Sequence, residues 1–290
     1  MTRGGPAAAP RTASAAIAAL SAALLCAACT VEPIPHSPEP IASAMEFGQS
    51  RVRGGDNGLE LVQWSVPATP AHVAEVLERH GLQDAVDPAM RERLARNGLH
   101  LCLVPVADLP ATLADLGGTL ADMRHWHGQV LEWREVVRVG VADGQPVFAD
   151  GKVRALQEGS LRLSLRGYTL PMEDGGVFRL EMVPHAVGQE SAGSVAMAAR
   201  DRVRGDAFKG GCAAVSLRRD LACLVCADAA PQAAGGEGPD AAPPPSLGAL
   251  LLPTQSLPIV PGSPAQERTT VLVLLARMPD ALCAPMEGAS

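Results

Sequence analysis

The sequence predicts an α+β fold, in which a small β-α-α-β-α layer is followed by an antiparallel, β-rich and sandwich-like half. Two helix-start signals in the first half, Thr69-Pro70 and Asp87-Pro88, combine a capping side chain with proline at the first helical position. After Gln129 the apolar residues recur with a period of two, which is typical of half-buried strands. Turn signals that contain glycine separate these later strands.

The first thirty residues have the features of an export signal rather than of a folded element. Arg3 and Arg11 form a charged region, an apolar run extends from Ala13 to Leu25, and Cys26-Ala27-Ala28-Cys29 follows. The apolar run is too short to cross a bilayer, for which about 20 residues are needed. We therefore expect a signal peptide over residues 1–28.

The residues around the expected cleavage site allow two kinds of processing. Ala27, Ala28 and Cys29 resemble the end of a bacterial lipobox, which would make Cys29 the lipidated first residue. Cys26 stands where that pattern usually has Leu, so ordinary signal-peptidase cleavage after Ala28 stays open and would give a secreted or soluble periplasmic protein. Lipidation predicts a membrane anchor in the cell envelope facing the periplasm, with the outer membrane favoured because Thr30 follows the lipid site.

Residues 29–55 are predicted to be a flexible tether, because prolines, serines and glycines replace periodic apolar residues there. A mixed α/β subdomain is predicted over residues 56–127. Its expected elements, in order, are a strand at 59–66, a helix at 69–80, a helix at 87–96, a strand at 99–106 and a helix at 109–116.

An antiparallel β-rich subdomain is predicted over residues 128–280, with a disordered loop at 228–245 and a tail at 281–290. The clearest alternation is at Leu161–Leu165, and Gly167 after it predicts a bulge. Thr269–Ala276 is almost entirely apolar, which predicts a central strand covered on both faces. Other expected strands are at 137–141, 177–183, 213–217 and 221–227, with turns at Asp143-Gly144 and Asp150-Gly151.

Composition and charge exclude some classes of partner. Aromatic residues make up 3% of the chain, so few rings remain for stacking on sugars or bases once the core is filled. The net charge of −7 argues against nucleic acid, because binding to nucleic acid depends on neutralising phosphates.

Five cysteines remain beyond the leader and the candidate lipid site, and an odd number leaves at least one thiol unpaired. They are Cys102, Cys212, Cys223, Cys226 and Cys283, and the sequence leaves their pairing open. Cys223 and Cys226 lie in the strand pattern LACLVCA. Residues three apart on a strand point to opposite faces, so this pair is predicted to be structural rather than a zinc or redox site.

His125-Trp126-His127, followed by Glu132, resembles the first metal motif of cupins, although the flanking glycines miss the expected spacing by one. On a strand the two imidazoles share a face and could meet one metal together with Glu132. If the preceding helix continued through Met123, the two imidazoles would lie about 200° apart around the helix and could not bind the same metal ion. A solvated turn before a strand is the third and preferred interpretation.

No nucleophile elbow, metalloprotease motif or phosphate-binding glycine loop is present, so we expect no enzyme and no cofactor. The run from Arg91 to Gly117, RERLARNGLHLCLVPVADLPATLADLG, resembles a segment of exported proteins of planctomycete-type bacteria, in which a β-rich half follows. This resemblance implies the same architecture and the same location in the cell envelope, and it adds no site residue.

Together the patterns predict a non-enzymatic cell-envelope lipoprotein that acts as a structural or protein-interaction module. Its expected partners are the membrane, through the lipid on Cys29, and an envelope protein. The alternative is a metal-binding protein or metal-dependent enzyme that uses His125, His127 and Glu132.

Overall fold

The structure of this protein is a computed structural model. It describes residues 57–172, 175–188, 205–228, 243–258 and 265–283. All of them belong to one compact unit, Pro40–Ser290. The predicted signal peptide, the lipidation site Cys29 and the tether lie outside the described residues. So do most of the predicted loop 228–245 and of the predicted tail 281–290.

The first half contains the β-α-α-β-α order that the sequence predicts. Its elements are β1 (Gly58–Val66), α2 (Pro70–His80), η1 (Gln83–Ala85), α3 (Pro88–Ala95), β2 (Leu99–Pro105), η2 (Val106–Asp108), α4 (Leu109–Asp115) and β3 (Ala121–Gly128). The expected caps are present, because the side chain of Thr69 accepts from the N–H of His72 and that of Asp87 from the N–H of Ala89.

The second half is rich in antiparallel strands, as predicted. Its strands are β4 (Val130–Val141), β5 (Pro146–Ala149), β6 (Lys152–Ala155), β7 (Gly159–Leu170), β8 (Val177–Gly188), β9 (Asp206–Ala207), β10 (Ala213–Leu217), β11 (Leu221–Ala227), β12 (Gln255–Pro258) and β13 (Ala265–Arg277). Its short helices are η3 (Lys209–Gly211), α5 (Leu247–Leu251) and α6 (Asp280–Cys283), the last of which includes the start of the predicted tail.

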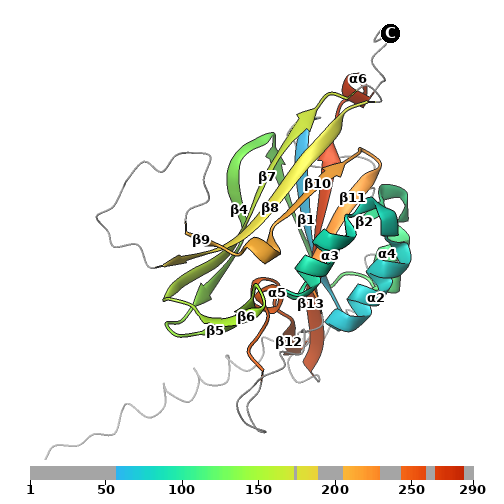
Figure 1. Cartoon of the computed structure of the whole chain (residues 1–290). Helices are drawn as coiled ribbons and strands as arrows, with labels where there is room; N and C mark the ends of the chain where they lie inside the picture. Colours follow the sequence, from blue (N-terminus) through green and yellow to red (C-terminus); the bar gives the residue numbers. More distant parts are fainter. Residues whose placement is uncertain (1–56, 173–174, 189–204, 229–242, 259–264, 284–290) are drawn as a thin grey trace, which may run out of the picture. The chain divides into compact units, whose positions relative to one another are not determined.

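The strands form two main sheets and one hairpin. Sheet A has the order β2-β11-β13-β1-β3, with β12 added to β13, and sheet B has the order β10-β8-β7-β4, with β9 added to β8. In Figure 1 the helices α2 and α4 lie on one side of the molecule and sheet B lies on the other.

The expected subdomain boundary at residues 127/128 does not separate the two sheets. Sheet A takes β1, β2 and β3 from the first half, but β11 and β13 from the second half lie between β2 and β1. The physical reason is that β1 and β2 do not pair with each other: β1 pairs with β13, and β2 pairs with β11. The first half therefore cannot complete its sheet alone.

Two hydrophobic cores lie on the two faces of sheet A. One core lies between the sheets and joins, for example, Leu61 and Leu274 of sheet A to Leu163 and Phe178 of sheet B. The other lies between sheet A and the helices, where Trp64 packs with Val73 and Leu77 of α2 and with residues of α4. The sequence prediction for 269–276 is confirmed, because alternate residues of β13 belong to different cores.

The turn predictions are confirmed in part. Asp150 and Gly151 both have positive φ, at 53° and 77°, and they join β5 to β6 as a two-residue hairpin. Residues 143–144 also form a turn, but it leads from β4 to β5, and these strands do not pair.

Gly167 lies beside an irregularity of sheet B, as the sequence suggests, although the extra residues are on β4. The pairing of β7 with β8 runs through Gly167 without a break, and the irregularity lies in the pairing with β4. A Cβ atom at this position would overlap the ring of Phe178. Gly167 therefore leaves room for one of the few aromatic side chains in the core.

Candidate functional site

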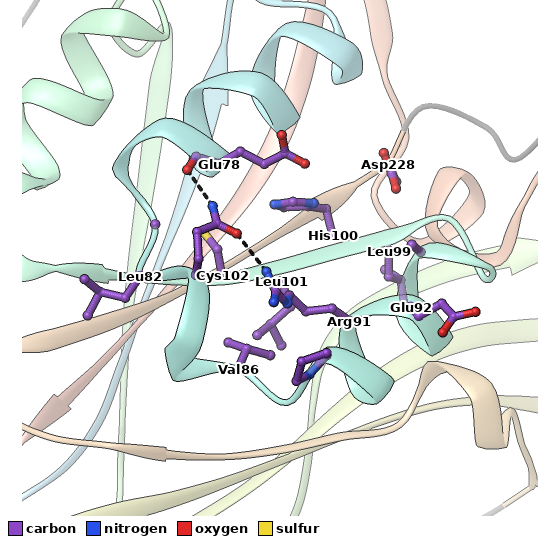
Figure 2. A pocket seen from close by; sticks show the side chains of 14 residues that line it. Glu78, Leu82, Val86, Arg91, Glu92, Leu99, His100, Leu101, Cys102 and Asp228 are labelled. Carbon is purple, nitrogen blue, oxygen red and sulfur yellow. Dashed lines mark hydrogen bonds between the residues drawn. The ribbon is translucent and has the colours of Figure 1, made fainter.

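A pocket of about 330 Å³ lies where α2, η1, α3 and β2 meet (Figure 2). Local sequence signals determine where the helices that line it begin and end. Gly81 ends α2 by donating its N–H to the carbonyl of Leu77, and the N–H of Leu82 then bonds the carbonyl of Leu103, each at 2.8 Å. Pro88 begins α3 on the opposite side. The segment that lines the pocket is thus fastened to the edge strand β2.

His100 of β2 is the central polar group of this pocket. Its Nε2 atom is buried and has no hydrogen-bond partner among the described residues. Burial lowers the pKa of the imidazole, and Arg91 lowers it further, although the nearby carboxylates of Asp228 and Glu78 act in the opposite direction. His100 is therefore neutral near pH 7.

The pocket does not contain an activated cysteine nucleophile. Cys102 lies two residues beyond His100 on β2 and also lines the pocket. Burial raises the pKa of its thiol to about 12, and no stabilisation by His100 opposes this effect. Because the thiolate is the reactive form, Cys102 is an inert, buried thiol at physiological pH.

Acidic side chains predominate around the pocket. The carboxylates of Glu78, Glu92 and Asp228 line it, and within the described part of the chain none of them has a hydrogen bond or an ion pair. The one lining guanidinium, that of Arg91, donates to Oε1 of Gln83 at 2.7 Å. Gln83 in turn donates to the backbone carbonyl of Glu78 at 2.8 Å. The pocket therefore carries an excess of negative charge.

The predicted metal ligands do not form a metal centre. Residues 121–128 form an edge strand, so the preferred expectation of a solvated turn is wrong. His125 and His127 are two apart on β3, and their ring centroids are 6.3 Å apart. Glu132 lies on β4, because Gly128, at φ 62°, turns the chain from sheet A into sheet B. No group of three His, Cys, Asp or Glu residues that could hold a metal occurs among the residues that the structure describes.

The structural interpretation of Cys223 and Cys226 is confirmed. Cys223 faces the core between the sheets, and Cys226 faces the core under the helices. The other described cysteines are Cys102, Cys212 and Cys283. All five are free thiols in this structure. The disulfide pairings that the sequence left open are therefore not formed here.

A serine–histidine contact was not visible in the sequence. Oγ of Ser164 lies 2.9 Å from Nε2 of His185, with the two residues on neighbouring strands of sheet B and 21 positions apart. Ser164 is 4% exposed and lies outside the pocket described above. A nucleophilic serine must reach a substrate, so this contact is structural.

The outer face of sheet B carries a cluster of charged side chains. We call it the arginine face and define it as Arg138, Arg162, Arg166, Arg179, Glu135, Glu181 and Trp133. Glu135 forms ion pairs with Arg138 and Arg162 at 2.8 and 3.1 Å.

On the neighbouring strands of the arginine face, Glu181 accepts from Arg166 at 2.5 Å and lies 3.9 Å from Arg179. The guanidinium of Arg166 also lies over the ring of Trp133, 4.9 Å from its centroid. Four guanidinium groups therefore share two carboxylates, and the face has an excess of positive charge.

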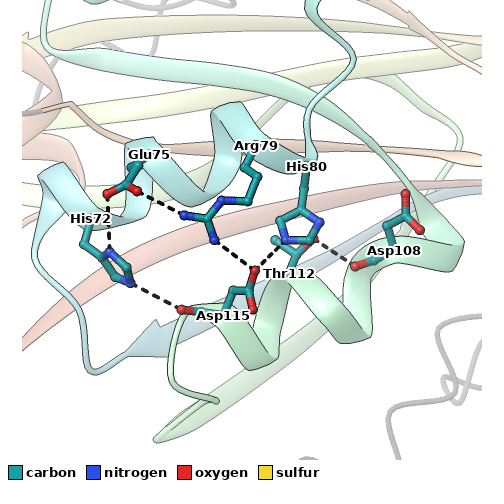
Figure 3. A network of polar contacts seen from close by, with 7 residues as sticks. All are labelled: His72, Glu75, Arg79, His80, Asp108, Thr112 and Asp115. Atoms are coloured by element: carbon teal, nitrogen blue, oxygen red, sulfur yellow. Dashed lines mark hydrogen bonds and ion pairs between the residues drawn. The ribbon is translucent and has the colours of Figure 1, made fainter.

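A second polar network joins α2 to α4 (Figure 3). Oδ2 of Asp115 contacts Nε2 of His80 at 2.9 Å and Nη1 of Arg79 at 3.2 Å. These contacts, with the hydrogen bond to His80 first, hold the pKa of Asp115 below its usual range. Arg79 also pairs with Glu75 of its own helix at 3.0 Å. Because the network lies on the surface and outside the pocket described above, it is a bridge between helices rather than a site.

Comparisons with family models, with curated proteins and with solved structures find no match, so no catalytic family is identified. In the described part of the chain, no helix is long and apolar enough to span a membrane.

Proposed function

We propose that this chain is a non-enzymatic lipoprotein of the cell envelope, anchored through Cys29, whose folded part acts as a protein-interaction module. The observation that carries the interaction role is the arginine face. Two further observations support a non-catalytic role: Cys102 is protonated and Ser164 is buried, so neither acts as a nucleophile.

The chemistry of the arginine face favours a protein partner that presents carboxylates. Its positive excess contrasts with the net charge of −7 of the whole chain. Guanidinium groups bind carboxylates through two parallel hydrogen bonds, and Arg and Trp are enriched at the centres of protein interfaces. Because the ion pairs already hold these side chains in place, binding costs less conformational entropy than it would for free arginines.

The membrane anchor is tested by a Cys29→Ser variant. We expect the wild-type protein in the membrane fraction and the variant in the soluble fraction, because the variant has no thiol to carry the acyl chains. Cys26→Ser is the matched control and should remain in the membrane fraction, since Cys26 is removed with the signal peptide. Equal membrane association of Cys29→Ser and wild type would contradict the proposal, and so would a mature protein that still begins at Met1.

The arginine face is tested by a double variant, Arg138→Ala with Arg179→Ala. Their side chains are 56% and 36% exposed, so we expect a change in stability of no more than about 1 kcal/mol, which a thermal melt checks. After crosslinking in intact envelopes, a stoichiometric protein partner should be recovered with the wild type and lost with the variant. Raising the salt concentration should weaken the same complex.

The control for this experiment is Arg96→Ala with Lys152→Ala, which removes the same charge from exposed positions outside the arginine face. We expect this control to keep the partner. Equal recovery of the partner by the arginine-face variant would rule out this face as the contact surface.

A further inference from the structure

We propose that the carboxylate-bearing partner of the arginine face binds as an extended strand of alternating apolar and acidic residues, which adds to sheet B along the segment 137–141 of β4. This inference rests on the proposed function, because it states the form in which the partner presents its carboxylates. The two are separable, since a partner could also meet the arginine face with a helix or a loop.

The strand β4 lies at the edge of sheet B. Among the described strands it pairs with β7 alone, and the strand order of the sheet ends with it. Its pairing with β7 is irregular before Val137, which makes the first part of the edge a poor template for another strand. From Val137 to Val141 the register is regular. This segment therefore offers main-chain N–H and C=O groups on its outer side to a further strand.

The inner face of the same segment favours apolar side chains in the partner. Leu161 and Leu163 of β7 are fully buried in the core between the sheets. Their partners on β4, Val139 and Val137, lie on the same face of the sheet but are only half-buried. Apolar residues of an added strand would cover the exposed parts of these valines, and the burial of apolar surface favours binding.

The outer face of the segment favours carboxylates. Arg138 lies directly opposite Arg162 of β7, and its side chain is 56% exposed. Within the described part of the chain, these two guanidinium groups share a single carboxylate, that of Glu135. An acidic residue of the added strand, placed opposite Arg138, would supply a second counter-charge and could accept two parallel hydrogen bonds.

The two faces together define the sequence pattern of the partner. Successive side chains of a strand point to opposite faces, so an acidic residue that meets Arg138 has neighbours that meet Val137 and Val139. In strand addition the main-chain hydrogen bonds provide affinity and the alternate side chains provide specificity. A second copy of β4 fits less well, because antiparallel pairing centred on Arg138 would place two guanidinium groups opposite each other.

The test measures binding of capped seven-residue peptides to the full chain by calorimetry. A peptide that alternates valine with glutamate should bind saturably, and the same peptide with lysine in place of glutamate should bind at least tenfold more weakly. Two further valine–glutamate peptides carry N-methyl groups on alternate main-chain amides, one set of amides in each peptide. In an added strand only one of these sets faces β4. One methylated peptide should therefore bind like the parent, and the other at least tenfold more weakly.

A charge reversal on β4 tests the contact with Arg138. We expect Arg138→Glu to reverse the preference between the glutamate and lysine peptides. Arg96→Glu makes the same change of charge at an exposed position outside the arginine face and should keep the wild-type preference. A thermal melt checks that both variants are folded.

Three outcomes would overturn strand addition. The first is that the valine–glutamate peptide does not bind saturably, and the second is that both methylated peptides bind like the parent. The third is self-association of the full chain that Arg138→Glu abolishes, which would assign this edge to a second copy. The proposed function would survive the second outcome, because it depends on the crosslinked partner and on its loss with Arg138→Ala and Arg179→Ala.

Discussion

Replacing Glu60 by leucine is expected to lower the free energy of unfolding by about 3–5 kcal/mol. Glu60 is fully buried on β1, which lies between β13 and the edge strand β3 in sheet A. Its Oε2 accepts from Nε of Arg277 at 2.7 Å and lies 2.6 Å from Nη2 of the same side chain. Its Oε1 lies 3.6 Å from Nη1 of Arg124. Removing the carboxylate leaves two arginines, 14% and 16% exposed, without their shared counter-charge.

The measurement is urea denaturation of the wild type and three variants. Arg277→Met alone should also destabilise, because the carboxylate of Glu60 then stays buried with a single, more distant guanidinium. The double variant Glu60→Leu with Arg277→Met should recover most of the loss, since apolar side chains of similar size replace both partners and Arg124 keeps its contact with Asp122. If Glu60→Leu is within 1 kcal/mol of the wild type, the buried ion pair contributes little to the stability of the fold.

Replacing Gly248 by alanine is expected to cost about 3 kcal/mol, at the upper end of the range for overpacked sites. Gly248 lies in α5, and its N–H donates to the carbonyl of Asn97 at 3.0 Å. A Cβ atom here would overlap the carbonyl oxygen of Gly98, which is backbone and cannot turn away as a side chain could. The helix α5 must therefore shift, although Leu247 and Leu251 anchor it in the core.

A shift of α5 would also disturb the hydrogen bonds of the Asn97 side chain. Its amide nitrogen donates to the carbonyl of Arg93, and its Oδ1 accepts from the N–H of Asp150 in the β5–β6 hairpin, both at 2.8 Å. Gly140→Ala is the control, because a Cβ atom on this exposed residue of β4 meets nothing within 4 Å. We expect the control to change stability by less than about 1 kcal/mol, as measured by urea denaturation. A loss of similar size in both variants would contradict the argument from close backbone contact.

The sequence predicted the local elements where capping and periodicity are strong. Thr69-Pro70 and Asp87-Pro88 do start helices, and Leu161, Leu163 and Leu165 do face the core. It did not predict β3, because an exposed edge strand has no alternation of buried residues to reveal it. Nor did it predict the strand order of sheet A, since pairing between distant strands leaves no trace in local patterns.

Local sequence patterns could not predict the pocket either. His100 lies inside the apolar run LHLCLVPV, where it looked like one residue of an ordinary strand. Asp228 reaches the same space from the end of β11, far along the chain. Conversely, Glu132 is close in sequence to His125 and His127, but the turn between the two sheets separates it from them. Whether Cys29 carries a lipid stays a prediction.

The position of β13 in the middle of sheet A sets the time at which this protein can fold. Glu60 and Arg277 are 217 positions apart and yet form an ion pair, so the central strands come from opposite ends of the folded region. A ribosome must therefore synthesise nearly all of this region before β1 meets its partner, and such distant pairings form slowly. Our proposal requires a polypeptide that crosses a membrane before it folds. The late pairing of β1 with β13 keeps such a chain unfolded until most of it has been synthesised.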